Sequence, residues 1–299
     1  PVEVPVEGRS KVEFAGPDIP YGFARCAVVV ESGDGLPADD RYLFSIERTD
    51  PRRVAFFGSQ RAELYFRNAL EAAAGGAYTL VRTPLPAEAS FAVVADAAVD
   101  ETALAEYVRR GGSVLIALGP NLAARTKVPV TGQRISGTRF ASRDGERFLS
   151  LGQVDAAYAP LAKAGLWEGV RFYQVVQVEP ATADIHARLA DQTPVLFERK
   201  VGEGRVVVLA SGLDGLANDL PLQPSFVPFV EQIAHRLSGW QQAALSVPVD
   251  TPLDFATAGV SMAFEALDPD GNRALSLEES SRGTPLVVDR AGFWEVRRG

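Results

Sequence analysis

Cysteine and histidine are scarce in this sequence of 299 residues, which holds one Cys and two His. With Cys26 as the only cysteine, no disulfide can form within the chain. A zinc site is disfavoured, because such sites gather several His and Cys ligands at close spacing. Cys26 lies in the apolar run 26–30, which is typical of a strand. We therefore expect a packed side chain there and not a nucleophile.

Long hydrophobic runs and basic clusters are also missing. The apolar stretches reach about six to eight residues, whereas a membrane-spanning helix needs about 20. The 30 Lys and Arg residues are outnumbered by 38 Asp and Glu, for a net charge of −8, which argues against a nucleic-acid partner. The chain starts at Pro1 without Met and stops abruptly. We expect a fragment of a longer protein, with any membrane segments outside it.

The pattern of apolar residues divides the chain into three stretches. Residues 1–48 alternate short apolar runs with Gly, Pro and Asp, which is typical of β-strands joined by turns. Residues 49–242 alternate strand and helix patterns. Residues 243–299 return to short strands with Pro and Gly between them and show no helical period. We expect an α/β domain over 49–242, preceded by a β segment and followed by a β domain.

Within 49–242, strands and helices alternate in the order expected of a doubly wound, largely parallel sheet of flavodoxin-like type. Ser59 and Asp100 are placed to cap the first two helices, and Ser225 to cap the last one. Further strands are expected near 134–140, at 170–178, 185–189, 195–199 and 205–210, with a short helix at 158–166. Gly202 and Gly204 indicate a hairpin between the last two of these strands.

Six stretches resemble one family, the large bacterial membrane proteins of the BatA, or aerotolerance-operon, type. They are Asp34–Tyr42, Tyr107–Gly119, Val201–Gly212, Asn218–Pro221, Phe226–Val230 and Gly292–Val296. The resemblance implies a domain like that of class I glutamine amidotransferases, flanked by immunoglobulin-like β segments. It also implies an extracytoplasmic, periplasmic location between membrane anchors. A von Willebrand A domain, common in such proteins, has no metal-site motif in these residues.

The chemistry of a working amidotransferase is not visible in the sequence. Such an enzyme needs a Cys on a strained strand-to-helix turn, with His and Glu to activate it. Here Cys26 precedes the α/β stretch, and neither His186 nor His235 begins a His-x-Glu motif. A Gly-x-Ser-x-Gly elbow and a phosphate-binding loop are absent as well. We expect no cofactor.

One stretch, 211–221, is placed to form a ligand groove. It follows an apolar strand, and ligands of open α/β sheets bind beyond the carboxyl ends of the strands. The groove candidates are polar residues of this stretch together with one that follows an earlier strand: Ser211, Asp214, Asn218, Asp219 and Asn121. The alternative is that these side chains cap turns and helix ends.

A second stretch, 268–279, resembles a calcium loop. Asp268, Asp270, Asn272 and Glu279 supply oxygen atoms at suitable spacing. However, Arg273 stands where such a loop needs a glycine, and no flanking helices are expected. The alternative is a hairpin turn between two strands.

Three functions remain open at this point. The first is a non-catalytic segment that binds a protein partner during assembly of a membrane-anchored protein. The second is a divergent amidotransferase-like or hydrolytic enzyme with unrecognised residues. The third is a calcium or small-ligand binding module. The missing nucleophile favours the first.

Overall fold

The structure is a computed structural model that describes residues 10–13, 19–30, 40–82, 88–141, 148–165, 167–239, 247–253 and 263–298. The chain divides into two compact units. One consists of residues 50–241, and the other combines 1–49 with 242–299. Among the described residues, no helix has both the length and the apolar character needed to cross a bilayer.

The 50–241 unit is built on an eight-stranded sheet with the order β4-β3-β5-β6-β12-β11-β10-β8. The first five of these strands are parallel, and the last three are added antiparallel. Their bounds are Arg52–Gly58 (β3), Tyr78–Val81 (β4), Phe91–Ala95 (β5), Ser113–Ala117 (β6), Leu151–Val154 (β8), Asp184–Leu189 (β10), Pro194–Val201 (β11) and Gly204–Leu209 (β12). The sheet is thus mixed, with a parallel half of the expected doubly wound type. The antiparallel half follows from the tight hairpin at Gly202, which reverses the chain after β11.

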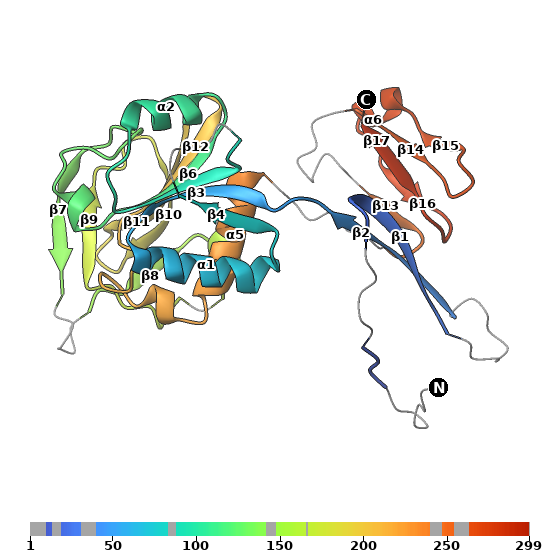
Figure 1. The fold of residues 1–299 in the computed structure, drawn as a ribbon. Coiled ribbons are helices and arrows are strands. Elements are labelled where there is room, and N and C mark those ends of the chain that lie inside the picture. Colours follow the sequence, from blue (N-terminus) through green and yellow to red (C-terminus); the bar gives the residue numbers. More distant parts are fainter. Residues whose placement is uncertain are drawn as a thin grey trace. The chain divides into compact units, whose positions relative to one another are not determined.

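Helices cover both faces of the parallel half (Figure 1). Helices α1 (Gln60–Ala74) and α5 (Phe226–Ser238) pack together on one face, and α2 (Glu101–Arg109) lies on the other. Strands between two helical layers must be apolar on both sides. Accordingly, every residue of β5 and β6 is buried. The sequence prediction of an α/β sheet covered on both faces is confirmed.

Two of the three predicted helix caps are present. The Ser59 hydroxyl accepts a hydrogen bond from the Ala62 amide, and the Asp100 carboxylate accepts two from the first turn of α2. The prediction for Ser225 was wrong, because its hydroxyl makes no capping bond and, among the described residues, is buried without a hydrogen-bond partner. Its backbone is already helical, which turns the side chain away from the cap position.

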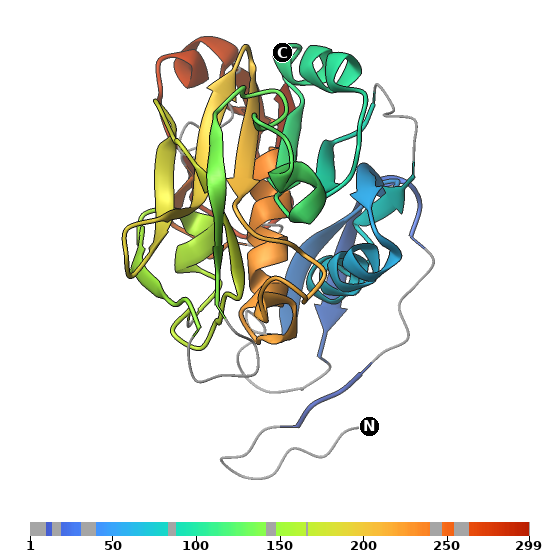
Figure 2. The same cartoon turned by 90° about the vertical axis from the view of Figure 1, so that its left-hand side faces the viewer.

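Two further segments differ from expectation. The strand expected over 170–178 is confined to β9 (Gln174–Val178), which pairs with β7 (Ile135–Phe140) in a separate two-stranded sheet. This pair faces the viewer in Figure 2. The helix expected over 158–166 is only the single turn α4 (Ala159–Ala162). Strand β9 is diverted from the main sheet because it bonds instead to the chain that follows β12.

The second unit consists of small antiparallel sheets. Strands β1 (Gly22–Val29) and β2 (Arg41–Arg48) form a hairpin. Near the other terminus, β13 (Thr251–Leu253) pairs with β16 (Leu286–Val288), and β14 (Phe264–Leu267) pairs with both β15 (Arg273–Leu275) and β17 (Glu295–Arg298). A short helix, α6 (Leu277–Ser281), was not predicted; a capping box between Ser276 and Glu279 stabilises it. The arrangement of these sheets as an immunoglobulin-like domain stays a prediction.

Burial of Tyr107 on α2 predicts an alkaline-sensitive contribution to stability. Its hydroxyl donates to the Ala89 carbonyl at 2.9 Å, and burial raises the pKa of Tyr107 to about 12. The folded state therefore holds this proton more tightly, and the stabilisation is lost as the pH rises from about 10 to about 12. At pH 8, Tyr107→Phe should lower the unfolding free energy by about 1 kcal/mol. In denaturant unfolding at rising pH, the difference in unfolding free energy between the unmodified chain and Tyr107→Phe should become smaller above about pH 10 and then change sign. A difference that does not change with pH would contradict the assignment.

Candidate functional site

The strand-to-helix turns are the places where an enzyme of this fold class could present a nucleophile. Two such turns are tight, and each contains a glycine with no room for a side chain. A Cβ on Gly58, the last residue of β3, would lie 2.8 Å from the Phe56 ring and 2.9 Å from Ala95. A Cβ on Gly119, between β6 and α3 (Pro120–Ala123), would lie 2.5 Å from the Asp96 carboxylate. Neither glycine position can carry a catalytic side chain without rearrangement.

The Asp96 carboxylate closes the turn after β6. One of its oxygens accepts hydrogen bonds from the Gly119 and Leu122 amides at 3.1 and 2.8 Å. The other accepts from the Asn121 amide and side chain at 3.2 and 3.0 Å. The Asn121 side chain also bonds the Asp96 carbonyl. Asn121, one of the predicted groove residues, is therefore engaged in fixing the start of a helical turn.

Ser211 and Asn218, two other predicted groove residues, do lie together, but both are fully buried. The Asn218 amide donates to the Ser211 hydroxyl at 2.8 Å and to the Gly212 carbonyl at 2.7 Å. Its side-chain oxygen accepts from the Leu220 amide at 3.0 Å. Ser211 in turn donates to the Gln174 carbonyl on β9 at 2.8 Å. This network holds the loop in one conformation and leaves neither side chain open to solvent.

Strand β9 covers the carboxyl end of β12, where the groove was expected. The Val176 amide donates to the Ala210 carbonyl at 2.7 Å, which complements the bond from Ser211 to Gln174. The Asp219 carboxylate accepts from the Arg171 amide at 2.7 Å and from the Gln223 side chain at 3.0 Å. Asp214 accepts from the Leu216 amide at 2.9 Å. The structure therefore brings together only Ser211 and Asn218 of the five predicted residues.

Two leucines in and directly after this loop are exposed. Leu216 is 53% exposed and Leu222 is 58% exposed, on either side of the fully buried Asn218. A leucine held in water by a fixed loop gains nothing for folding, because the hydrophobic effect rewards only burial. The loop thus presents two large apolar side chains from a rigid backbone.

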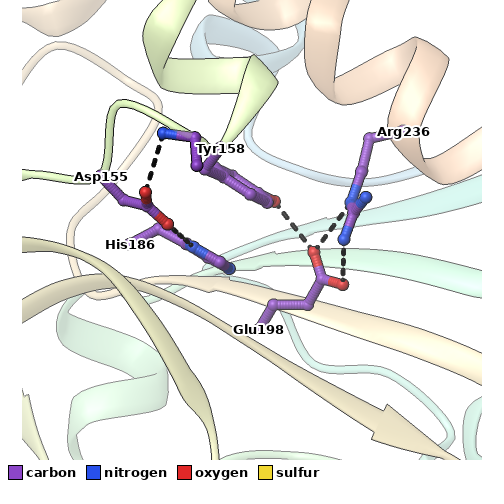
Figure 3. Close-up of polar contacts among 6 residues, drawn as sticks. Asp155, Tyr158, His186, Glu198 and Arg236 are labelled. Carbon is purple, nitrogen blue, oxygen red and sulfur yellow. Dashed lines mark hydrogen bonds and ion pairs between the residues drawn. The ribbon is translucent and has the colours of Figure 1, made fainter.

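A polar cluster that the sequence analysis missed lies inside the antiparallel half of the sheet (Figure 3). Its centre is the carboxylate of Glu198 on β11, a residue that is only 7% exposed. Arg236 of α5 binds both carboxylate oxygens, at 2.9 and 3.2 Å. Arg205 of β12 contacts one oxygen at 3.0 Å, and the Tyr158 hydroxyl donates to the other at 3.0 Å. One buried acid therefore links two strands, a helix and the segment before α4.

The Tyr158 ring extends this cluster to His186 on β10. The two rings stack face to face with centroids 3.6 Å apart and planes inclined by 8°. His186 Nδ1 lies 3.0 Å from an Asp155 carboxylate oxygen, and this hydrogen bond holds the pKa of Asp155 below its usual range. Burial and the neighbouring Glu198 carboxylate raise the pKa of Tyr158, so the phenol stays protonated and continues to donate.

The paired Asp155 and His186 resemble the base and orienting acid of a hydrolase, but the third member is missing. In such a site the second imidazole nitrogen receives a proton from a hydroxyl or thiol. Here His186 Nε2 is buried without a hydrogen-bond partner among the described residues. The stacked Tyr158 ring covers one face of the imidazole. The geometry therefore supports a structural role for the pair.

The calcium-loop residues form a β-turn with its own ion pairs. The Asp268 carboxylate accepts from the Asp270 and Asn272 amides, as in the hairpin alternative. Arg290 binds both Asp268 and Asp270, so a cation already lies beside these carboxylates. Glu279 points to the amide and hydroxyl of Ser276, in the capping box of α6. No cluster of metal-binding side chains occurs in the part of the chain that the structure describes.

No family model and no curated protein matches the sequence. Among solved structures, a β-galactosidase from Bacillus circulans sp. alkalophilus is 13% identical, with a TM-score of 0.46 over 65% of this chain and 32% of the enzyme. A cytoplasmic protein from Salmonella typhimurium is 11% identical, with a TM-score of 0.47 over 72% of this chain and 96% of that one. A ThuA-like protein from Parabacteroides merdae is 16% identical, with a TM-score of 0.42 over 68% and 95%. The chain thus spans about a third of the β-galactosidase, and these likenesses identify neither a family nor a function.

Proposed function

We propose that this chain is a non-catalytic, extracytoplasmic segment of a membrane-anchored bacterial protein, and that it binds a protein partner during assembly. Its 50–241 unit would be a glutamine amidotransferase-like domain without the catalytic Cys, and the second unit would be immunoglobulin-like. The resemblance to BatA-type proteins supports the location and the domain types. The calcium module is not proposed, because Arg290 is already paired with Asp268 and Asp270, and Glu279 bonds to Ser276.

The proposal rests on how the polar side chains are used at the carboxyl ends of the parallel strands. An active site needs polar groups that remain available to a substrate and a concave space that admits it. Here the Asp96, Ser211 and Asn218 side chains bond to the protein itself, and β9 lies across the end of β12. Two apolar side chains of the chain that follows β12, Leu216 and Leu222, are exposed near this end of the sheet. Exposed apolar side chains on a fixed loop suit contact with another protein.

A divergent enzyme is the alternative function, and it would have to use the Asp155 and His186 pair. That reading requires a nucleophile or a bound water next to His186 Nε2, where the structure has a buried nitrogen without a partner. Replacing His186 with glutamine would abolish the activity of such an enzyme. Under our proposal, His186→Gln reduces stability only.

Site-specific photo-crosslinking tests the proposal. A photoreactive amino acid is placed at position 216 or 222 of the full-length protein in its own cells. The matched control is position 110, because Arg110 is exposed at the opposite edge of the sheet, between α2 and β6. We expect positions 216 and 222, but not 110, to yield one discrete product that contains a different protein. Products from all three positions, from none, or only with a second copy of this chain would refute the proposed binding surface.

Protease accessibility tests the location independently. We expect added protease to cleave this segment in spheroplasts and to leave it intact in whole cells. Protection in both preparations would place the segment in the cytoplasm and remove that half of the proposal.

A further inference from the structure

The second unit is built from two segments that the whole 50–241 unit separates in sequence. Residues 1–49 supply the hairpin of β1 and β2, and residues 242–299 supply strands β13 to β17 (Figure 1). The two segments contact each other, because the Arg25 guanidinium lies 3.7 Å from the Glu295 carboxylate and 5.6 Å from the centre of the Phe293 ring. The 50–241 unit is therefore an insertion within the second unit.

The hairpin of β1 and β2 has no core of its own. No residue of either strand is fully buried, and even the opposed pair Cys26 and Phe44 is only half-buried. An isolated two-stranded hairpin is marginally stable at best in water. Its hydrogen bonds therefore depend on association with the 242–299 segment, and the exchange of its amide hydrogens reports that association.

The folded 50–241 unit brings its own two ends together. Arg52 is the first residue of β3 and lies opposite Tyr78, the first residue of β4. The Tyr78 hydroxyl lies 3.0 Å from the hydroxyl of Ser238, the last residue of α5. The point where the chain enters this unit is thus separated from the point where it leaves by one strand spacing, about 4.8 Å, and one tyrosine side chain.

This closeness shortens the loop that the two segments of the second unit must close. About 200 residues lie between the end of β2 and the start of β13. With the 50–241 unit folded, only residues 49–51 and 239–250, about 15 in all, have to span the remaining distance. The entropic cost of closing a loop of n residues grows as (3/2)RT ln n. Shortening the loop from about 200 to about 15 residues favours closure about 50-fold.

We propose that the folded 50–241 unit acts as a clamp that holds the two segments of the second unit together. Association of these segments is about 50-fold more favourable when the 50–241 unit is folded than when it is unfolded. The coupling acts through the connecting chain and needs no contact between the units. It is reciprocal, so a partner that binds only the folded 50–241 unit also favours the associated second unit. The coupling does not rest on the proposed function, so either can fail without the other.

Hydrogen–deuterium exchange of the full chain tests the coupling. Val94→Asp together with Ile116→Asp places two carboxylates opposite each other in the buried pair of β5 and β6. Two buried and unpaired carboxylates should unfold the 50–241 unit, which the exchange of its own amides reports. We expect the amides of β1 and β2 to exchange about 50-fold faster in this variant. The matched control, Glu203→Ala on the surface of the same unit, should leave their exchange unchanged.

A linker insertion separates coupling through the chain from coupling through contacts. Inserting about 30 flexible Gly and Ser residues between Gln241 and Gln242 triples the short loop, so the β1 and β2 amides should exchange about fivefold faster. In the doubly substituted variant the loop is already long, and the same insertion should change their exchange by less than about 1.5-fold. The control insertion, between Gly75 and Gly76, leaves the ends of the 50–241 unit in place and should have no effect.

Two results would overturn the proposal. One is hairpin exchange that is equally slow with and without a folded 50–241 unit. The other is hairpin exchange that the insertion after Gln241 does not change, because coupling through the chain must depend on the length of the loop.

Discussion

Replacing Glu198 with alanine is expected to lower the free energy of unfolding by about 4 kcal/mol. The substitution leaves Arg205, Arg236 and the Tyr158 hydroxyl without the one carboxylate that they share. Removal of one partner from a buried ion pair is far more costly than its presence is beneficial, because the remaining charges lose their compensation. Because the two arginines are partly exposed, we expect a loss of unfolding free energy near the middle of the range for broken buried ion pairs and not above it.

Urea unfolding of the full chain, followed at the transition of the 50–241 unit, measures this effect. Glu203→Ala is the matched control, since Glu203 lies on the adjacent hairpin and its side chain is 82% exposed in a surface pair with Lys200. Surface pairs contribute about 0 to 1 kcal/mol, so the control should be nearly neutral. Glu198→Gln should fall between the two, because it keeps the shape and loses the charge. A loss below about 1 kcal/mol for Glu198→Ala would show that the cluster does not hold the antiparallel strands to α5.

Replacing Asn218 with aspartate is expected to lower the unfolding free energy by about 3 kcal/mol at neutral pH. The change is a single atom, but it replaces two donated hydrogen bonds by an oxygen that faces the Gly212 carbonyl at 2.7 Å. The Ser211 hydroxyl can turn to donate to the new carboxylate, at the loss of its bond to Gln174. The Gly212 carbonyl has no hydrogen to offer. Asn218 is fully buried, so water cannot relieve the repulsion.

The loss should depend on pH in a definite direction. A buried carboxylate beside a carbonyl is easier to protonate, so its folded-state pKa would lie above the unfolded value of about 3.9. The folded state is then favoured below that value and penalised as the pH rises through the folded pKa. Unfolding at pH 4 and pH 7 should therefore give a smaller loss at pH 4. Asp214→Ala, which removes one exposed turn bond, should cost less than about 1 kcal/mol at both pH values.

Local elements of the α/β unit could be read from the chain because their signals are local. The capping bonds of Ser59 and Asp100 lie within three residues of the side chain that makes them. Strand β6 was recognisable because four of its five residues, Val114–Ala117, are apolar, and all five are buried. The hairpin at Gly202 was predicted from glycines that permit the left-handed backbone found there. Each of these depends on contacts that are close in sequence.

The Glu198 cluster could not be predicted in the same way. Its members, Tyr158, Glu198, Arg205 and Arg236, extend over 78 positions of the sequence and all meet only when two strands, a helix and the segment before α4 pack. One signal was present: Glu198 directly follows the apolar run 195–197 within a predicted strand, and a buried acid there would need partners. The sequence does not show which arginines fulfil that need. For the same reason, the residues of β9 were predicted to belong to a longer strand over 170–178. The hydrogen bonds of β9 to Ala210 and Ser211 join residues that are far apart in the sequence.

The sequence by itself determined the order of the secondary-structure types, with an α/β stretch between two β stretches. It also determined that the α/β stretch contains no cysteine to act as a nucleophile. Only the tertiary structure decided how the polar side chains are used. It placed Asn121, Ser211 and Asn218 against backbone groups, and it left Leu216 and Leu222 in solvent. The physical reason is that a buried polar group must find a partner, and that partner is chosen by the packing of distant segments. A sequence specifies which groups need partners, and the fold assigns the partners.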